Sequence, residues 1–535
     1  MADGYARLTN KPQCVIVHVD VGTQALSSAI HNASCGRCPV LIFAGLSPFT
    51  AEGEMRGSRT EYIHWIQDVP DQRQIVSQYC RYTAEIKTGK NIKQMVNRAL
   101  QFATSAPTGP VYLVGAREVM EEEIEPYSIE QKHWGAVYPA ALPISGVEQI
   151  SEAIVSAQLP LVIVGYLGRH ERAVKQLVHL ADIIPGLRVL DAGGSDMSFP
   201  ANHPGWLGLR VSGHEAIKTA DVILVIDCDV PWIPTQGKPL SYAKIFHIDV
   251  DPLKQQMPLF YIPSLATFRA DAGTALEQLN TYISSQNTLT DMMSTEAYVK
   301  RSIAVRESYS ERLRLLAEKA ARPQGVDAPF NPEYLFSQVR SACPEDTIWA
   351  VEAVTLAERV SAHIQATFPK SWINCGGGGL GWSGGGALGI KLATDDQHGG
   401  RGKGKFVCQV VGDGTFLFSV PGSVYWIARR YEIPVLTIVL NNKGWNAPRN
   451  SLLLVHPDEA GSRATNEELN ISFAPTPDYA GIAKAAAGGK LWAGRAGTVE
   501  ELAKLLPEAV RSVLDGKGAV LEAQLNGKDG KYAGN

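Results

Sequence analysis

The 535-residue sequence predicts an α/β protein with three doubly wound domains, each built around a parallel sheet. Three separate stretches alternate short apolar runs with amphipathic helical segments, which is the pattern of repeated strand–helix–strand units. Hydrophobic residues make up 45% of the chain and charged residues 19%, so each domain can bury a sizeable core. We expect the domains to span residues 1–127, 143–283 and 333–530.

Each domain is predicted from its own apolar runs. In the first domain we expect strands near 14–19, 39–44 and 109–114, with a helix over 91–104. In the second we expect strands at 161–164, 189–190, 222–227 and 245–249, with a helix over 171–181. A polar helical segment over 295–321 leads to the third domain, whose clearest elements are strands 406–411 and 434–440 around a helix over 419–431.

Polar residues follow both of those strands in the third domain. Gly412-Asp413-Gly414-Thr415 ends the first strand, and Asn441-Asn442 ends the second. The carboxyl ends of parallel strands meet at one sheet edge, where open α/β sheets place ligands. A carboxylate and an amide oxygen suit Mg²⁺ bridging to phosphate. The alternative is an ordinary strand pair in which Asp-Gly and Asn-Asn only make turns.

This Gly-Asp-Gly…Asn-Asn unit resembles the signature of thiamine diphosphate enzymes. The resemblance implies that Asp413, Asn442 and the Gly444 carbonyl ligate Mg²⁺, and that Thr415, with Gly412 and Gly414 beside it, meets the diphosphate. The three predicted domains are similar to the pyrimidine-binding, middle and diphosphate-binding domains of the acetolactate synthase-like and benzoylformate decarboxylase-like group.

The glycine-rich run 374–389 allows two interpretations. Its segment 379–384 satisfies the G-x-G-x-x-G dinucleotide pattern, which alone is a weak signal. It also resembles the thiamine family's glycine-rich stretch, in which Leu380, between Gly379 and Gly381, would bend the cofactor so that proton removal becomes intramolecular. The alternative for Leu380 is ordinary core packing.

Thr355 follows another predicted strand and opens a helix. A hydroxyl and backbone N–H groups at a helix start suit a diphosphate oxygen, so Thr355 is a further predicted cofactor contact. Its alternative role is simple N-capping of the helix.

In the first domain, His18 ends a predicted strand that runs into a glycine turn, His18-Val-Asp-Val-Gly22-Thr23-Gln24. This pattern resembles benzoylformate decarboxylase, which implies that His18 moves protons at the reacting carbon or orients the substrate carboxylate, with Gly22, Thr23 and Gln24 beside the substrate. An imidazole titrates near neutrality and suits that task. A lone histidine at a strand end is also often a hydrogen-bonded structural residue.

Two further segments resemble substrate-facing parts of the family. Residues 62–68 match the stretch in which acetolactate synthase-like enzymes carry aromatic and Gln residues, which implies substrate contacts for His64, Trp65 and Gln67. Trp445, directly after Gly444, is a fourth such residue. Beyond it the chain has Pro448 and Arg449 where pyruvate decarboxylases place an acidic residue, so that assignment loses support.

The first residues resemble the middle of the family's first domain. On that comparison the chain would lack the first strand and helix, about 50 residues, together with the glutamate that activates the cofactor, and a sheet edge would be exposed. Either the sequence is an incomplete version of an active enzyme, or a paralogue has lost its activating glutamate.

The sequence therefore predicts a thiamine diphosphate- and Mg²⁺-dependent decarboxylase or carboligase that acts on a 2-keto acid. Two rivals remain: a weak or inactive paralogue that binds cofactor or a partner subunit, and a nicotinamide dehydrogenase. FAD is doubtful, because residues 227–234 differ from the Gly-x-Arg-containing turn of acetolactate synthases. The resemblance implies a homodimer or homotetramer.

The charge and composition of the chain limit its binding partners and its location. The net charge of −4 gives no reason to expect nucleic acid, and no apolar run is long enough to span a bilayer. Eight scattered cysteines fit a reducing compartment, so we expect a cytoplasmic protein, with mitochondria as the alternative.

Overall fold

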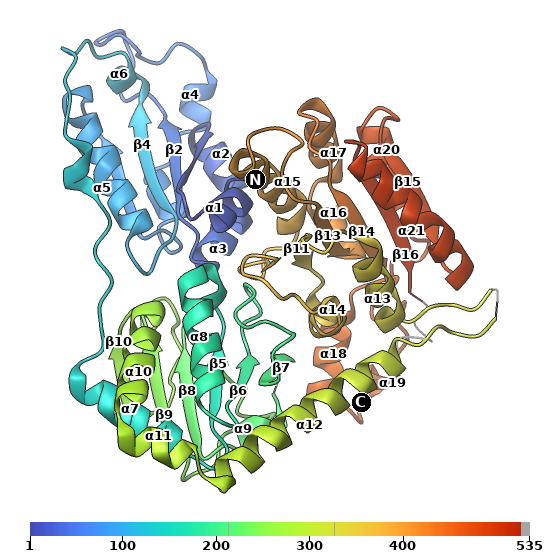
Figure 1. Cartoon of the computed structure of the whole chain (residues 1–535). Helices are drawn as coiled ribbons and strands as arrows, with labels where there is room; N and C mark the ends of the chain where they lie inside the picture. Colours follow the sequence, from blue (N-terminus) through green and yellow to red (C-terminus); the bar gives the residue numbers. More distant parts are fainter. Residues whose placement is uncertain (212, 326, 526–535) are drawn as a thin grey trace. The chain divides into compact units, whose positions relative to one another are not determined.

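A computed structural model describes residues 1–211, 213–325 and 327–525, and it confirms the predicted α/β class with three parallel sheets (Figure 1). By contacts the chain divides into two compact units. The first holds residues 1–139, 253–260 and 375–382, and the second holds the remainder. Residues 526–530 of the expected third domain lie outside the described residues. No described helix is long and apolar enough to cross a membrane.

The first unit contains a four-stranded sheet of order β1-β2-β4-β3. Buried side chains cover both of its faces, in clusters around Ile42 on one face and Leu113 on the other. The edge strand β3 was not predicted, because its side chains are mostly half-buried and its apolar pattern is weak. The strands are Gln13–Val17 (β1), Val40–Leu46 (β2), Tyr82–Ile86 (β3) and Val111–Ala116 (β4); the main helices are Ala2–Thr9 (α1), Val19–Ala25 (α2), Ser27–Cys35 (α3) and Ile92–Thr104 (α5).

The middle sheet, in the second unit, has the order β10-β9-β8-β5-β6-β7. Its central strand β5 is wholly buried, as its apolar run predicts. The two strands that the sequence did not reveal, β7 and β10, are the two edges, and each has only four residues. The strands are Leu161–Val164 (β5), Arg188–Asp191 (β6), Trp206–Leu209 (β7), Val222–Ile226 (β8), Lys244–Asp249 (β9) and Ala266–Arg269 (β10); the main helices are Ile144–Ser156 (α7), Glu171–Ile183 (α8) and Ala272–Ser285 (α10).

The third sheet has the order β12-β11-β13-β14-β16-β15. Two helices lie between β13 and β14, and the second confirms the helix expected over 419–431. The first begins directly at Asp413, and Val420 in the left-handed conformation (φ 55°) separates it from the second, which starts at Pro421. The strands are Ile348–Glu352 (β11), Trp372–Asn374 (β12), Val407–Gly412 (β13), Leu436–Asn441 (β14), Trp492–Ala496 (β15) and Ala519–Gln524 (β16); the main helices are Ala357–Ile364 (α14), Trp382–Gln397 (α15), Asp413–Phe418 (α16), Pro421–Arg430 (α17), Tyr479–Ala486 (α20) and Val499–Leu514 (α21).

A segment of the middle domain covers the edge strand β12 of the third sheet. Asp196 forms an antiparallel bridge with Ile373, the Asn374 N–H donates to the Ser195 carbonyl (2.9 Å), and the Trp372 indole N–H donates to the Gly194 carbonyl (2.9 Å). We call residues 194–197 the edge strap. It satisfies backbone groups that an open edge would leave unpaired.

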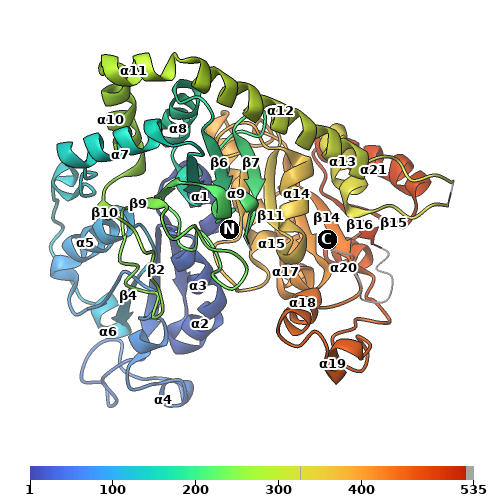
Figure 2. The same cartoon turned by 90° about the horizontal axis from the view of Figure 1, so that it is seen from below.

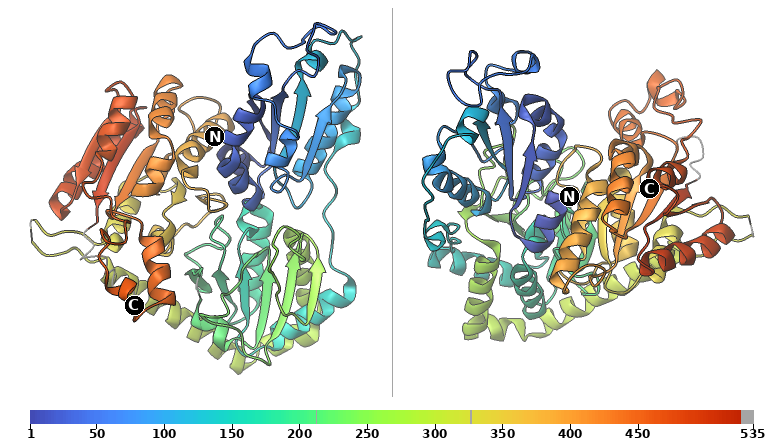
Figure 3. Two further views of the ribbon diagram at one scale, coloured as in Figure 1. Left: turned by 180° about the vertical axis from the view of Figure 1, so that it is seen from behind. Right: turned by 90° about the horizontal axis from the view of Figure 1, so that it is seen from above.

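The long helix Glu296–Lys319 (α12) runs past both domains of the second unit (Figure 2). Its largely polar sequence reflects a helix that lies on the surface, as the views in Figure 3 also show. It is fastened by side chains: the Tyr298 hydroxyl donates to the Val155 carbonyl (2.7 Å), and the Tyr309 hydroxyl donates to the Ala201 carbonyl (2.9 Å).

The edge strap is also held by a buried ion pair, which yields a first prediction. Arg169 donates to Asp196 across 3.1 Å, and both side chains are almost fully buried. The substitution Asp196→Ala leaves a buried guanidinium without its carboxylate, so we expect a loss of about 3–5 kcal/mol in urea unfolding.

Glu311→Ala is the matched control, because it breaks an ion pair with Arg314 whose side chains are about half exposed. We expect that change to stay within about 1 kcal/mol. Equal effects of the two substitutions would contradict the assigned role of the buried pair.

Candidate active site

The site is built where β13 and β14 end at the same edge of the third sheet. The two strands are parallel neighbours, and Gly412 is in register with Leu440. Asp413 therefore emerges beside Asn441 and Asn442, as the spacing predicts. Asp413 is the first residue of α16 and is only 3% exposed.

Asp413 organises the loop that follows β14. Its Oδ2 accepts the backbone N–H groups of Asn442 (3.1 Å) and Gly444 (3.3 Å), while Oδ1 accepts the N–H of Gly414 (2.8 Å). The loop is thus held by the same carboxylate that the sequence assigns to a metal. Asp413, Asn442 and Gly444 are brought together.

Oxygen atoms from these three residues converge. In one orientation of the Asn442 amide, its oxygen lies 2.8 Å from the Gly444 carbonyl oxygen and 3.2 and 3.3 Å from the two Asp413 carboxylate oxygens. These atoms are all acceptors, so this orientation leaves no hydrogen bond between the Asn442 amide oxygen and the other oxygens. In the opposite orientation the amide nitrogen donates to all three, and its oxygen accepts from the Asn446 amide (2.9 Å).

The converging oxygens fit a small divalent cation. Octahedral Mg²⁺ with ligands at about 2.0–2.1 Å separates neighbouring ligand oxygens by about 2.9 Å, close to the spacing found here. The described residues contain no group of three His, Cys, Asp or Glu side chains placed to hold a metal. A set of one carboxylate, one amide and one carbonyl is typical of hard cations that also bind phosphate.

Burial governs the charge of Asp413. Removal from water raises the pKa of this carboxyl to about 6, although the N–H groups of Gly414, Gly444 and Asn442 partly offset the effect. A cation at the converging oxygens would favour the ionised form. Without a cation, the buried charge costs stability.

Close packing leaves no room for a side chain at two glycine positions of the site. A Cβ atom on Gly414 would lie 2.3 Å from the indole of Trp445, and one on Gly444 would lie 2.3 Å from the Ile471 carbonyl oxygen. Trp445 is half-buried and makes edge contacts with Phe418 and Phe473. It therefore lies over the Asp413 turn, whereas the sequence assigned it to the substrate.

The two threonines predicted as cofactor contacts differ in exposure. Thr415 lies in the first turn of α16 and is 4% exposed. Thr355 is exposed in the short 3₁₀ turn Val354–Leu356 (η5) between β11 and α14. The alternative of N-capping was wrong for Thr355, because Leu356 precedes α14 and no side chain caps that helix.

Residues 375–382 of the glycine-rich run belong to the first unit, where α3 contacts them. The Gly379 N–H donates to the Asn32 side-chain oxygen (3.0 Å), and the Asn32 amide donates back to the Gly379 carbonyl (2.6 Å). The Gly378 N–H donates to His31 Nε2 (3.1 Å). These bonds fix the backbone next to Leu380, which is half-buried, and Gly381. Nothing in the sequence singled out Asn32.

The turn expected after His18 was wrong. His18 is exposed and precedes α2, and Gly22 and Thr23 lie inside that helix. A glycine is tolerated in a helix at modest cost, so it did not mark a turn. Thr23 is fully buried, with its hydroxyl 2.8 Å from the Tyr112 hydroxyl, whereas Gln24 is exposed and donates to Asp20 (3.0 Å).

The second predicted substrate segment surrounds the short helix Ile63–Ile66 (α4). His64 is buried, and its Nδ1 accepts the N–H of Thr60 (3.2 Å). Gln67 is also buried, while Trp65 is 51% exposed. Of His64, Trp65 and Gln67, Trp65 is therefore the residue whose side chain reaches solvent.

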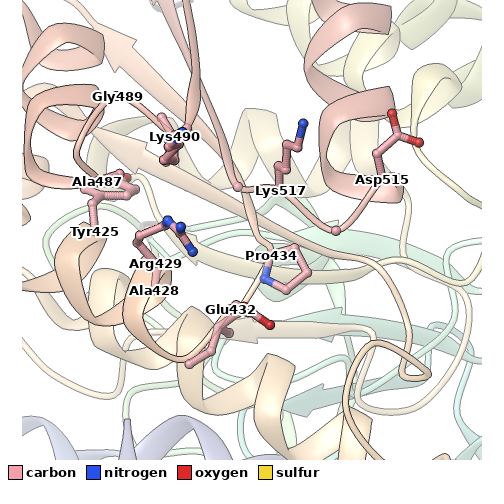
Figure 4. Close-up of a pocket in the computed structure, with 14 residues that line it drawn as sticks. Tyr425, Ala428, Arg429, Glu432, Pro434, Ala487, Gly489, Lys490, Asp515 and Lys517 are labelled. Atoms are coloured by element: carbon pink, nitrogen blue, oxygen red, sulfur yellow. The ribbon is translucent and has the colours of Figure 1, made fainter.

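A separate cavity of about 460 Å³ lies at the opposite, amino edge of the third sheet (Figure 4). The C-terminal ends of α17, α20 and α21 meet there. Arg429 lies in the last turn of α17, and Lys490 and Lys517 follow the ends of α20 and α21, where cations offset the helix dipole. It has no part in the Asp413 site.

Residues 1–75 match the domain described as "Thiamine pyrophosphate enzyme, N-terminal TPP binding domain", residues 147–279 match the central domain, and residues 354–522 match the C-terminal TPP binding domain. Thiamine pyrophosphate is thiamine diphosphate. The expected absence of a segment before residue 1, and the doubt about FAD, stay predictions.

Several curated proteins are similar over most of the chain. 2-Hydroxyacyl-CoA lyase 2 of Bos taurus is 23% identical over 83% of this chain and 71% of its own length. Benzoylformate decarboxylase of Pseudomonas aeruginosa is 23% identical over 84% and 78%. The acetolactate synthase large subunit of Haemophilus influenzae is 24% identical over 83% and 73%.

Solved structures share the fold. A thiamine diphosphate-dependent 4-hydroxybenzoylformate decarboxylase of Rhodococcus jostii RHA1 superposes with a TM-score of 0.75 at 20% identity, covering 98% of this chain and 89% of that one. Benzoylformate decarboxylase of Polynucleobacter necessarius gives 0.76 at 18% identity, with the same coverage.

The buried charge of Asp413 gives a second prediction. In metal-free protein Asp413→Asn removes a carboxylate whose pKa is about 6, against 3.8 in the unfolded chain, so we expect its stability relative to wild type to be greater above pH 6 than near pH 4 by up to about 3 kcal/mol. The wild-type carboxyl takes up a proton as the pH falls through 6, so the gain shrinks there and vanishes near pH 4.

Thermal unfolding at pH 7.5 and pH 5, with a chelator and without cofactor, measures this difference. A variant that is less stable than wild type at pH 7.5, by an amount that does not change at pH 5, would contradict the assigned cost of the buried charge.

Proposed function

Because the chain belongs to the family of thiamine diphosphate-dependent enzymes, which act as lyases and transferases, we propose that it is a Mg²⁺-dependent decarboxylase or carboligase of a 2-keto acid. The meeting of the Asp413 carboxylate, the Asn442 side-chain amide and the Gly444 carbonyl at one sheet edge is the observation that carries the proposal.

The residues of the third domain would hold the diphosphate end of the cofactor. Asp413, Asn442 and the Gly444 carbonyl supply metal ligands, and Thr415 at the start of α16 supplies a hydroxyl and backbone N–H groups beside it. Gly412 precedes the helix in an extended conformation, and Gly414 leaves room for the Trp445 indole. Bound thiamine diphosphate supplies a nucleophilic carbon and an electron sink for decarboxylation.

Residues of the first unit would serve the reacting end. The glycine-rich run, held by Asn32, presents Leu380 as the apolar support of the cofactor. His18 is exposed at the end of β1, where an imidazole can move a proton or meet a carboxylate. Trp65 is the exposed member of the second substrate segment.

The rival functions have less support. An inactive paralogue is not favoured, because the metal donors are assembled and all three domains match the enzyme family. A nicotinamide dehydrogenase is not supported by any of those matches. Two parts of the proposal have other grounds: a homodimer or homotetramer rests on the resemblance alone, and a cytoplasmic location rests on the scattered cysteines.

Isothermal titration with thiamine diphosphate tests the site. We expect binding that requires Mg²⁺ and that Asp413→Ala abolishes, because this substitution removes a metal ligand and the acceptor for three backbone N–H groups. Release of CO₂ from pyruvate or benzoylformate, measured on the same sample, tests the reaction. A folded wild-type protein that binds no thiamine diphosphate with Mg²⁺ would refute the proposal.

Substitution of His18 separates binding from chemistry. We expect His18→Ala to keep thiamine diphosphate affinity within about threefold and to slow turnover by about 10²–10⁴-fold, the usual contribution of a general acid–base. His133→Ala is the matched control, because His133 is also an exposed histidine of the first unit. Unchanged turnover in His18→Ala would remove His18 from the mechanism.

A further inference from the structure

Glu522 is a buried carboxylate that the proposed chemistry does not use. It lies in β16, which pairs with β14, and its side chain is 0% exposed. Its Oε1 accepts the side-chain N–H of Asn441 (2.8 Å), and its Oε2 lies 3.1 Å from Arg495 Nε. A buried carboxylate is costly unless it is paired. The two contacts of Glu522, and above all the one with Asn441 next to the proposed metal ligands, therefore indicate what this residue does.

The contact with Glu522 fixes the orientation of Asn441. An ionised carboxylate only accepts hydrogen bonds, so the Asn441 nitrogen must face Glu522 and its oxygen must face away. That oxygen accepts the backbone N–H of Lys443 (3.1 Å). A reversed amide would lose both bonds. Asn441 is itself fully buried, so water cannot replace them.

Three successive backbone N–H groups are then held by two side chains. Asp413 accepts those of Asn442 and Gly444, and Asn441 accepts that of Lys443 between them. Lys443 has a left-handed backbone conformation (φ 66°), which a residue with a side chain adopts at a cost. The bond from Lys443 to Asn441 stabilises this turn, which carries the Gly444 carbonyl back toward the Asn442 amide.

We propose that Glu522 is a positioning residue for the metal donors. It acts through Asn441, which holds the backbone N–H of Lys443 between the two ligands Asn442 and Gly444. The inference rests on the proposed function and extends it to a residue beneath the ligands. The Tyr479 phenol lies near both carboxylates. Its pKa is raised first by burial and then by the charges of Asp413 and Glu522, which agrees with a position of Glu522 beside the Asp413 site.

A charge exchange between the two residues tests the proposal. Asn441→Asp sets two carboxylates against each other, so we expect the Mg²⁺ affinity, measured by titration at saturating thiamine diphosphate, to fall by about 10–100-fold. The double variant Asn441→Asp/Glu522→Gln restores an amide–carboxylate pair with reversed roles, and we expect its affinity to return to within about threefold of wild type.

Two single substitutions of Glu522 extend the test. Glu522→Gln keeps an acceptor for Asn441, so we expect at most about a threefold change in Mg²⁺ affinity, whereas Glu522→Ala removes the acceptor and should weaken binding about tenfold or more. This comparison replaces the first one if Asn441→Asp does not fold.

Thr437→Val is the control for a purely structural effect. Thr437 is buried in β14 and donates to Gln409 (2.8 Å), away from the metal loop. We expect it to lower the melting temperature without changing Mg²⁺ affinity.

Three results would overturn the inference: wild-type affinity in Asn441→Asp, no recovery in the double variant, or a loss in Thr437→Val equal to that in Glu522→Ala. If wild-type protein itself binds neither Mg²⁺ nor thiamine diphosphate, the proposed function fails instead.

Discussion

The site depends on one carboxylate placed at the end of a parallel strand. Asp413 is delivered to the sheet edge by β13 and bonds three backbone N–H groups, two of them from the loop after β14. Those bonds shape the loop before any cation arrives. The same carboxylate also needs a positive partner, because burial raises its pKa to about 6. The Asp413 carboxylate therefore both shapes the loop and favours a cation beside it.

The Asn-Asn pair divides the work between its members. The Asn442 side-chain amide faces the Asp413 carboxylate and the Gly444 carbonyl. Asn441 turns the other way and joins Glu522 to the loop backbone. Two identical side chains next to each other in sequence thus serve different layers of the site, because Asn441 is the last residue of β14 and Asn442 is the first residue of the loop that follows.

The sequence predicted the fold class well, and it placed Asp413 and Asn442 at one sheet edge, for physical reasons. Buried parallel strands are continuous apolar runs, and polar residues at their ends mark the ligand edge, so Asp413 and Asn442 were readable. Edge strands such as β3 and β10 were missed, because half-buried side chains give weak patterns. Asn32 and Glu522 were missed because they act through contacts distant in sequence. The turn predicted at Gly22 was wrong, because glycine occurs in helices as well as in turns.

The edge strap has a consequence for recombining these domains. Residues 194–197 come from the middle domain yet complete the third sheet beside β12. A third domain excised at its own sequence boundary would leave that strand edge open to other chains, a known route to aggregation. Chimeras between relatives should therefore exchange the middle and third domains together, or transplant the strap along with the sheet that it seals.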